Sequence, residues 1–161
     1  VHLANQVGLR LSPTFVPFTP WITLEGYREL LALLVDLDLV ESVAPIQLVI
    51  RLLLPNGSLL LDHPATAPHL SGFDPALLSH QWANPDHRVD AFQQSVQQIV
   101  ETGERDDLDR RAIFAALWQA SHAACGVTAP DLPHTEGQAV PHMSEPWYCC
   151  AEPTADQLAR V

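Results

Sequence analysis

The sequence contains no lysine, and its eight basic residues, all arginine, face nineteen acidic residues. The formal net charge is −11 at pH 7. Proteins that bind nucleic acids or anionic membranes concentrate positive charge against the phosphates. This composition therefore predicts no nucleic-acid partner and no membrane partner.

Long apolar runs and cysteines are also scarce. No stretch of about 18 apolar residues is present, as a membrane-spanning helix would need, and the densest one, Leu30 to Val40, contains Asp36 and Asp38. No basic-then-apolar leader opens the sequence. Three cysteines are too few for a disulfide scaffold. The expected location is the reducing cytoplasm.

What is present fits one globular domain. The sequence has 161 residues, 47% of them hydrophobic, which is enough for one core. Its opening stretch, "VHLANQVGLRL", begins with Val1 rather than methionine and resembles the interior of a chain. We therefore expect a fragment or domain of a longer protein.

The first third of the sequence predicts a strand, a helix and a second strand. Residues 7–18 are rich in β-branched and aromatic types, with prolines placed for an edge. A helix is expected over about 23–40 from its apolar spacing, with Thr19 or Thr23 as the possible N-cap. The apolar run Ile46 to Leu54 predicts a buried strand. Such a right-handed βαβ unit needs further strands beside it.

The remainder is expected to be mostly helical. Residues 62–87 hold four prolines and four histidines and predict loops, with one or two helical turns in "DPALLSHQW". One helix is expected up to Gly103. A second should begin near Asp106 and Asp107 and end at Gly126. The two helices are predicted to pack as an antiparallel pair.

The adjacent Cys149 and Cys150 are the first candidate site, and they have three interpretations. The pair can be redox-active or nucleophilic, since the thiolate is the reactive form of cysteine. It can bind metal together with His134 or His142, although the spacing fits no standard zinc pattern. It can also be inert. A disulfide between neighbouring cysteines would be strained and labile.

Arg10 and Arg51 each interrupt an apolar strand and are the second candidate site. A charge is rarely buried without a partner. Both arginines are predicted either to contact a carboxylate in a cofactor or substrate site, or to pair with Asp36, Glu41 or a residue outside this sequence.

Other chemistry-bearing side chains have mostly structural interpretations. The four histidines of the loop region are expected at the surface or in caps, with a cleft as the alternative; they are His63, His69, His80 and His87. His122 and Cys125 lie three residues apart on one helix and predict a buried structural pair. Trp21 and Trp147 are expected to pack in the core or a lid.

The ending "EPWYCCAEPT" resembles the C-terminal signature of the radical S-adenosylmethionine proteins named for a CUAEP or CCAEP tail. Some members carry selenocysteine at the position equivalent to Cys150. The segments "SPTFVPFTPWITLEGY" and "IRLLLPNGSLLL" are similar to that family too. The resemblance implies an α/β fold: the last βαβ of a partial (β/α) barrel, then a helical C-terminal extension and an irregular tail. It also implies that Cys149 and Cys150 are reactive.

For the full-length protein, the resemblance implies a [4Fe–4S] cluster, S-adenosylmethionine and cobalamin. The family's cluster motif, C-x3-C-x2-C, is absent from this sequence, so the segment is expected to bind none of these cofactors alone. Its expected partners are the N-terminal barrel of the same polypeptide and a small-molecule or peptide substrate. The alternative is a small acidic, non-catalytic module that binds a protein through its loops.

These expectations divide the sequence into four segments. Residues 1–61 would supply the barrel strands and their helix, 62–87 a loop-rich connection, 88–126 the helical pair, and 127–161 a linker and the CCAEP tail.

Overall fold

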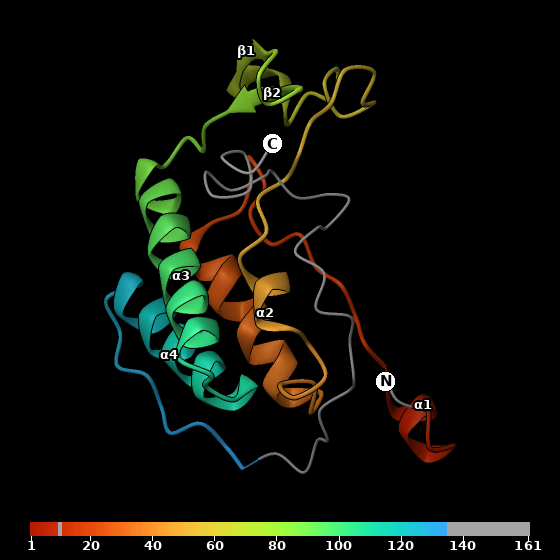
Figure 1. Cartoon of the computed structure of the whole chain (residues 1–161), viewed down its shortest axis with the longest axis vertical. Coiled ribbons are helices and arrows are strands. Elements are labelled where there is room, and N and C mark those ends of the chain that lie inside the picture. The colour runs from red at the N-terminus through yellow and green to blue at the C-terminus, as the bar shows by residue number, and fades with distance from the viewer. Residues whose placement is uncertain (10, 135–161) are drawn as a thin grey trace.

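The computed structural model describes residues 1–9 and 11–134. Three helices, α2 (Leu24–Asp36), α3 (His87–Arg105) and α4 (Arg110–Ala124), pack together, with a hairpin of β1 (Leu70–Asp74) and β2 (Ser79–Trp82) beyond one end of them (Figure 1). The short helix α1 (His2–Gln6) lies apart from this body. Two 3-10 turns, Pro45–Leu48 and Ala67–His69, complete the described elements. The chain is therefore of a mixed α/β class.

Each packed helix starts at a side chain that accepts a hydrogen bond from the exposed first turn. Thr23 Oγ1 accepts from Gly26 N at 3.0 Å, so the helix starts at Thr23 rather than Thr19. Asp86 caps α3, and Asp109 caps α4 through Ala112 N at 2.7 Å. Such caps satisfy backbone donors that have no partner within the helix. Helix α4, which was predicted to begin near Asp106 and Asp107, therefore has its cap two residues beyond Asp107.

All three helices end in the same way, with one residue in the left-handed conformation. Asp38 (φ 54°), Asp107 (φ 56°) and Gly126 (φ 70°) hold these positions. After each of them the backbone turns back: Leu39 N donates to Leu34 O at 2.8 Å and Leu108 N to Gly103 O at 2.9 Å. These are Schellman turns, which satisfy the last carbonyls of a helix. Helix α2 therefore ends at Asp36 and not near the predicted residue 40. The predicted end of α4 at Gly126 is confirmed.

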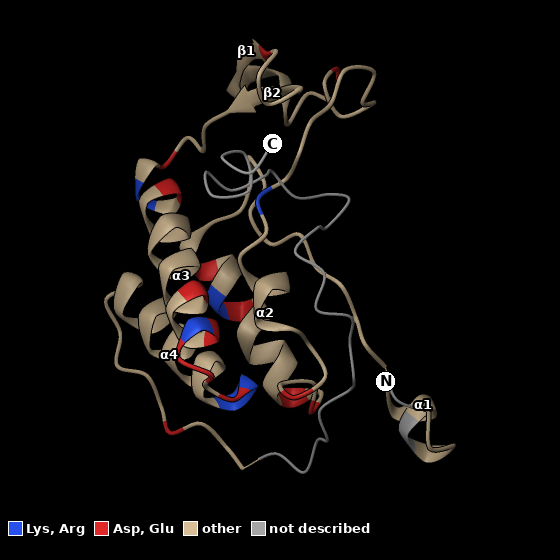
Figure 2. Cartoon of the chain, viewed as in Figure 1, with Lys and Arg blue, Asp and Glu red and all other residues tan. Residues whose placement is uncertain are grey.

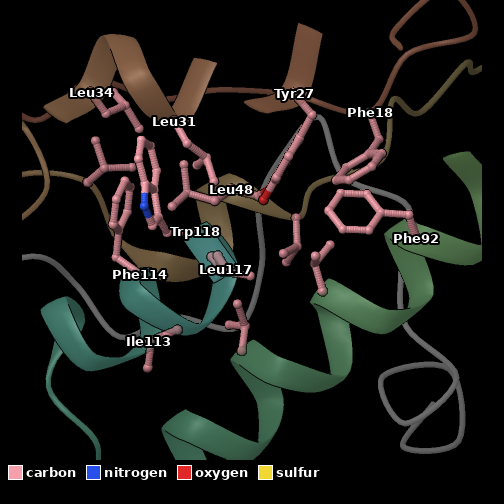
Figure 3. Close-up of a cluster of buried hydrophobic side chains, with 14 of the residues drawn as sticks. Phe18, Tyr27, Leu31, Leu34, Leu48, Phe92, Ile113, Phe114, Leu117 and Trp118 are labelled. Carbon is pink, nitrogen blue, oxygen red and sulfur yellow. The ribbon is translucent and has the colours of Figure 1, made fainter. Parts of the chain in front are cut away.

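The core lies between the three helices and the segment after α2 (Figure 3). Phe18, Tyr27 and Phe92 form an aromatic group with ring centroids 5.0–6.2 Å apart. The Tyr27 hydroxyl donates to Leu48 O at 3.0 Å, so its polar end is satisfied although the ring is buried. Burial of this group holds α2, α3 and the Phe18 segment together, since removing apolar area from water is the main source of folding free energy.

The predicted antiparallel pairing of the last two helices is confirmed by the contact of α3 with α4. The sequence predicted that the first of these helices ends at Gly103, but Gly103 lies inside α3 and faces Ile113. A Cβ on Gly103 would lie 2.6 Å from Ile113 Cγ1. The glycine is therefore required for the close approach of the two helices.

Neither of the two predicted strands of the βαβ unit forms a strand, so this prediction is wrong. Residues 11–17 form neither helix nor strand, and Pro45–Leu48 is a 3-10 turn. One parallel bridge remains between Phe18 and Arg51, in which Phe18 N donates to Ile50 O at 3.1 Å and Leu52 N donates to Phe18 O at 2.8 Å. Prolines remove the donors that a longer ladder needs. The apolar residues of both segments are instead buried on irregular backbone.

The loop region contains a hairpin that the sequence did not predict, and "DPALLSHQW" forms its turn and second strand rather than helical turns. Asp74 Oδ1 accepts from Ala76 N at 2.8 Å, and Leu78 adopts a positive φ of 52°. An aspartate that bonds the backbone two residues later initiates a turn. Strand β2 also contacts the segment after Arg51, because His80 N donates to Leu54 O at 2.8 Å.

Among the helices of the described residues, none is both long enough and apolar enough to cross a membrane.

Candidate functional site around Arg51

Arg51 forms the parallel bridge with Phe18 and lies where the hairpin meets the helices. Its Nη1 donates to Asp90 Oδ1 at 2.7 Å, and its Nη2 donates to the carbonyl oxygen of Trp82. The guanidinium carbon lies 3.5 Å from the centre of the Trp82 ring, in a cation–π arrangement. The side chain is only 19% exposed. Arg51 is therefore fixed in orientation by an acid, a carbonyl and an aromatic face.

Asp90 and Asn84 extend this arrangement to two further segments. The second carboxylate oxygen of Asp90, Oδ2, accepts from Asn84 N at 3.0 Å. The buried Asn84 side chain donates through Nδ2 to Ile22 O at 2.9 Å and accepts from Asp86 N at 2.9 Å. The bridge segment, the end of β2, the start of α3 and the residues before α2 therefore meet in one group. We call Arg51, Trp82, Asn84 and Asp90 the Arg51 cluster.

The chemistry of the Arg51 cluster is that of a positioned cation that forms an ion pair with the Asp90 carboxylate. An arginine presents planar donors that suit a carboxylate or phosphate. Its predicted role in binding a cofactor or substrate remains a prediction. The acid that pairs with it is Asp90, which the sequence analysis did not select.

The other predicted site residues fall mostly outside the described part of the chain. Cys149, Cys150 and Arg10 are not described, and neither are His142 and Trp147. Their predicted roles therefore remain predictions. Trp21 is described and is 47% exposed, so it does not pack in the core, while the alternative that it packs in a lid stays a prediction.

Cys125 is the one cysteine among residues 1–9 and 11–134, and it occupies the C-cap of α4. Partial burial, with a contribution from the Glu25 carboxylate, raises the pKa of its thiol. Both effects disfavour the negatively charged thiolate. Cys125 is thus a weak nucleophile at neutral pH.

His122 is buried, as predicted, while Cys125 is only partly so. The His122 Nδ1 donates to Trp118 O at 2.8 Å, and its ring lies 4.3 Å from the Trp118 ring, centre to centre. These contacts give the histidine a structural role within α4.

The four loop histidines do not converge on a metal site. His63 Nδ1 accepts from Ala65 N at 3.2 Å, and His80 Nε2 lies 2.8 Å from Asn56 Oδ1. Within residues 1–9 and 11–134, no group of three or more histidine, cysteine or acidic side chains could hold a metal ion. These described residues therefore do not fit an iron–sulfur cluster, which requires several thiolate ligands.

Sequence reasoning missed Trp82, Asn84 and Asp90. Asp90 lies in the first turn of a helix, where an acid is explained by the helix dipole alone. Asn84 directly precedes Pro85, and because an Asn-Pro pair is a common turn signal, it looks like a loop residue. The one signal in the sequence was Arg51 itself, because a charge within an apolar run indicates that an acid should face that charge.

Comparison with models of known protein families gave no match, and searches of curated proteins and of solved structures found no significant similarity either.

Proposed function

We propose that this chain is the C-terminal part of a radical S-adenosylmethionine enzyme whose tail supplies a reactive thiol from Cys150, assisted by Cys149. The sequence "EPWYCCAEP" carries the proposal, because two adjacent cysteines within an otherwise family-like tail are difficult to explain by packing. A thiol at a position where relatives use selenocysteine is expected to react rather than to fill space.

The geometry around Phe18 and Arg51 supports this proposal. Helix α2 connects two segments that form a parallel bridge, the order of elements expected in a (β/α) barrel. Arg51 belongs to that bridge, and its side chain is held in a fixed orientation by Trp82 and Asp90. A positioned arginine there is suited to an anionic group of the substrate or cofactor.

The cofactors belong to another part of the polypeptide in this proposal. The described residues supply no cluster ligands, and the whole sequence lacks C-x3-C-x2-C. The [4Fe–4S] cluster, S-adenosylmethionine and cobalamin would therefore be bound by the N-terminal barrel.

Iodoacetamide labelling of the folded chain tests the proposal, with Cys125 as an internal reference. Cys150 should label more than about tenfold faster than Cys125 at pH 7, because reactivity follows the thiolate fraction and accessibility. The raised pKa of Cys125 keeps its thiol protonated at that pH, and its labelling should accelerate as the pH rises. Peptide mapping by mass spectrometry measures each rate.

Two variants identify the reactive sulfur. Cys149→Ser should retain fast labelling at Cys150, whereas Cys150→Ser should lose most of it. Equal, slow labelling of Cys125 and Cys150 would contradict the proposal. So would a gene whose start codon lies at or just before Val1, with no C-x3-C-x2-C segment upstream.

The second candidate is a non-catalytic module that binds a protein, and exposed apolar side chains around the hairpin favour it. Leu59 and Leu78 are largely exposed, and Phe73 partly so. Exposed apolar groups gathered in one region are common at interaction sites. An upstream cluster motif supports the enzyme and counts against this module.

A further inference from the structure

Residues 128–133, here called the strap, follow helix α4 and run back along it (Figure 1). They form neither helix nor strand. Ala129 and Leu132 are half-buried and pack against the core, whereas the other strap residues are exposed. Burial therefore recurs at every third residue of the strap. A three-residue period is that of the polyproline II helix.

The two prolines of the strap, Pro130 and Pro133, favour this backbone conformation. The proline ring fixes φ at about −65°, and the residue before a proline is kept out of the helical region. Ala129 and Leu132 are those preceding residues. Both prolines are exposed, so their main contribution is conformation rather than packing. Because a polyproline II segment makes no internal hydrogen bonds, its carbonyls can accept from other groups.

Two side chains of α4 donate to these carbonyls. Trp118 Nε1 donates to Pro130 O at 2.9 Å, and Arg111 Nη2 donates to Pro133 O. Trp118 and Arg111 lie on one face of α4, two helical turns apart, and their backbone positions are separated by about 10.5 Å along the axis. Three residues of polyproline II rise by about 9.3 Å. The two donors are therefore spaced to reach carbonyls one polyproline II turn apart.

The strap is joined to the body by few contacts. Among the described residues, the last backbone hydrogen bond in this part of the chain is donated by Val127 N to His122 O at 3.0 Å, before the strap begins. The strap itself is held by the Trp118 and Arg111 side chains and by its two half-buried residues. Segments with few contacts open at a small part of the free energy of global unfolding. The strap can therefore leave α4 while the turn that ends this helix stays formed.

We propose that the face of α4 around Trp118 and Arg111, here called the Trp118 face, is a binding site for polyproline II segments and that the strap occupies it in cis. The partner in trans is an extended segment of another protein, with an aliphatic residue before each of two prolines three residues apart. The strap itself indicates this chemistry, because Ala129 and Leu132 each precede a proline and pack against the core. Aromatic side chains are the usual contacts of polyproline II ligands.

The strap is autoinhibitory in this proposal. A partner in trans has to displace it, because both would use the same two donors and the same apolar contacts. The apparent affinity of the Trp118 face is then reduced by the fraction of chains in which the strap is released. The proposal does not depend on whether the tail cysteines react.

Nuclear magnetic resonance of the complete chain tests the proposal through the Trp118 indole N–H. The signal belongs to one of four tryptophans and is assigned by its loss in Trp118→Phe. Leu132→Asp should release the strap, because a carboxylate would have to be buried against the core. The indole signal should then shift, since it loses the Pro130 carbonyl. The synthetic hexapeptide TAPDLP, which copies the strap, should return the signal to its wild-type position.

Three comparisons measure the specificity of the peptide for the Trp118 face. TAPDLP should bind Leu132→Asp at least about tenfold more tightly than TAGDLG, because the prolines pre-organise the bound conformation. It should bind the wild type at least about tenfold more weakly than Leu132→Asp, because the strap occupies the site. Arg111→Met, added to Leu132→Asp, should weaken binding about tenfold, since it removes a charged donor. Arg105→Met replaces an exposed arginine of α3 and should leave binding unchanged.

Circular dichroism verifies that each variant keeps its helices, and Pro130→Gly/Pro133→Gly provides a second opened chain without loss of a buried side chain. No response of either opened chain to millimolar TAPDLP overturns the proposal. Equal binding of TAPDLP and TAGDLG overturns the polyproline II specificity, and equal binding to the wild type and Leu132→Asp overturns the occupancy in cis. A wild-type dimer that is lost in Leu132→Asp overturns the assignment to another protein, because the strap of a second copy would then occupy the Trp118 face.

Discussion

Gly103 and Ile113 show how one residue sets the distance between two helices. The Ile113 side chain occupies the space where any other residue at 103 would place its Cβ. Sequence pattern alone interprets such a glycine as a helix end, because glycine weakens helix interiors. The actual constraint is a contact with a residue ten positions away, which becomes visible only when α4 is placed against α3.

Gly103→Ala should therefore destabilise the fold by about 1–3 kcal/mol, since the added methyl overfills a packed contact. This loss should exceed the gain of about 1 kcal/mol that alanine brings to an exposed helix. Urea unfolding of the two proteins measures the difference.

The partner substitution provides the control. In Gly103→Ala/Ile113→Ala the added methyl no longer clashes, so its cost should largely disappear relative to Ile113→Ala alone. A Gly103→Ala variant as stable as the wild type would show that the helices separate without cost.

At the scale of elements, the helices are defined by their ends. Thr23, Asp86 and Asp109 begin them, and a left-handed residue ends each. The Gly126 end was predictable, because glycine is the usual residue there. Asp38 and Asp107 hold the same position in the other two helices without being glycine, so their sequences gave no comparable signal.

Asp107→Gly should stabilise the protein by about 0.5–1 kcal/mol. The left-handed conformation costs about 1–2 kcal/mol for an L-residue, and this gain is partly offset by the greater freedom of glycine in the unfolded chain. The free energy of unfolding in urea measures the change.

The neighbouring Asp106 is the matched control, because it has an ordinary φ of −89°. Asp106→Gly should destabilise the protein, because it has the entropic cost of glycine without relief of strain and also loses the exposed Arg105–Asp106 ion pair, which contributes little. If both glycine variants shift stability in the same direction, backbone strain at Asp107 is not the cause.

For the whole molecule, the Arg51 cluster joins the hairpin to the helices. The element contacts of β1 and β2 are chiefly with each other, so the connection depends on the Arg51, Trp82, Asn84 and Asp90 bonds and on the segment after Arg51. The relative positions of several segments that are distant in sequence therefore depend on the Asp90 carboxylate.

Asp90→Ala should cost about 1–3 kcal/mol of stability, because it leaves two half-buried donors without their acceptor, one of them charged. It should also raise hydrogen exchange at Asn84 N, which donates to that carboxylate. Asp62→Ala, on an exposed loop residue, should change stability by less than about 0.5 kcal/mol. Unchanged exchange and stability in Asp90→Ala would show that the hairpin is held by other contacts.

The sequence by itself determined the helices and their faces, because a periodic apolar pattern and capping residues act over a few positions. It also determined the acidic charge and the paired tail cysteines, which are properties of composition and order. Only the tertiary structure decided the backbone conformation of the apolar run before Arg51, because burial of apolar side chains stabilises irregular backbone as well as a strand. The partner of Arg51 was decided in the same way, because Asp90 reaches it across thirty-nine residues of chain.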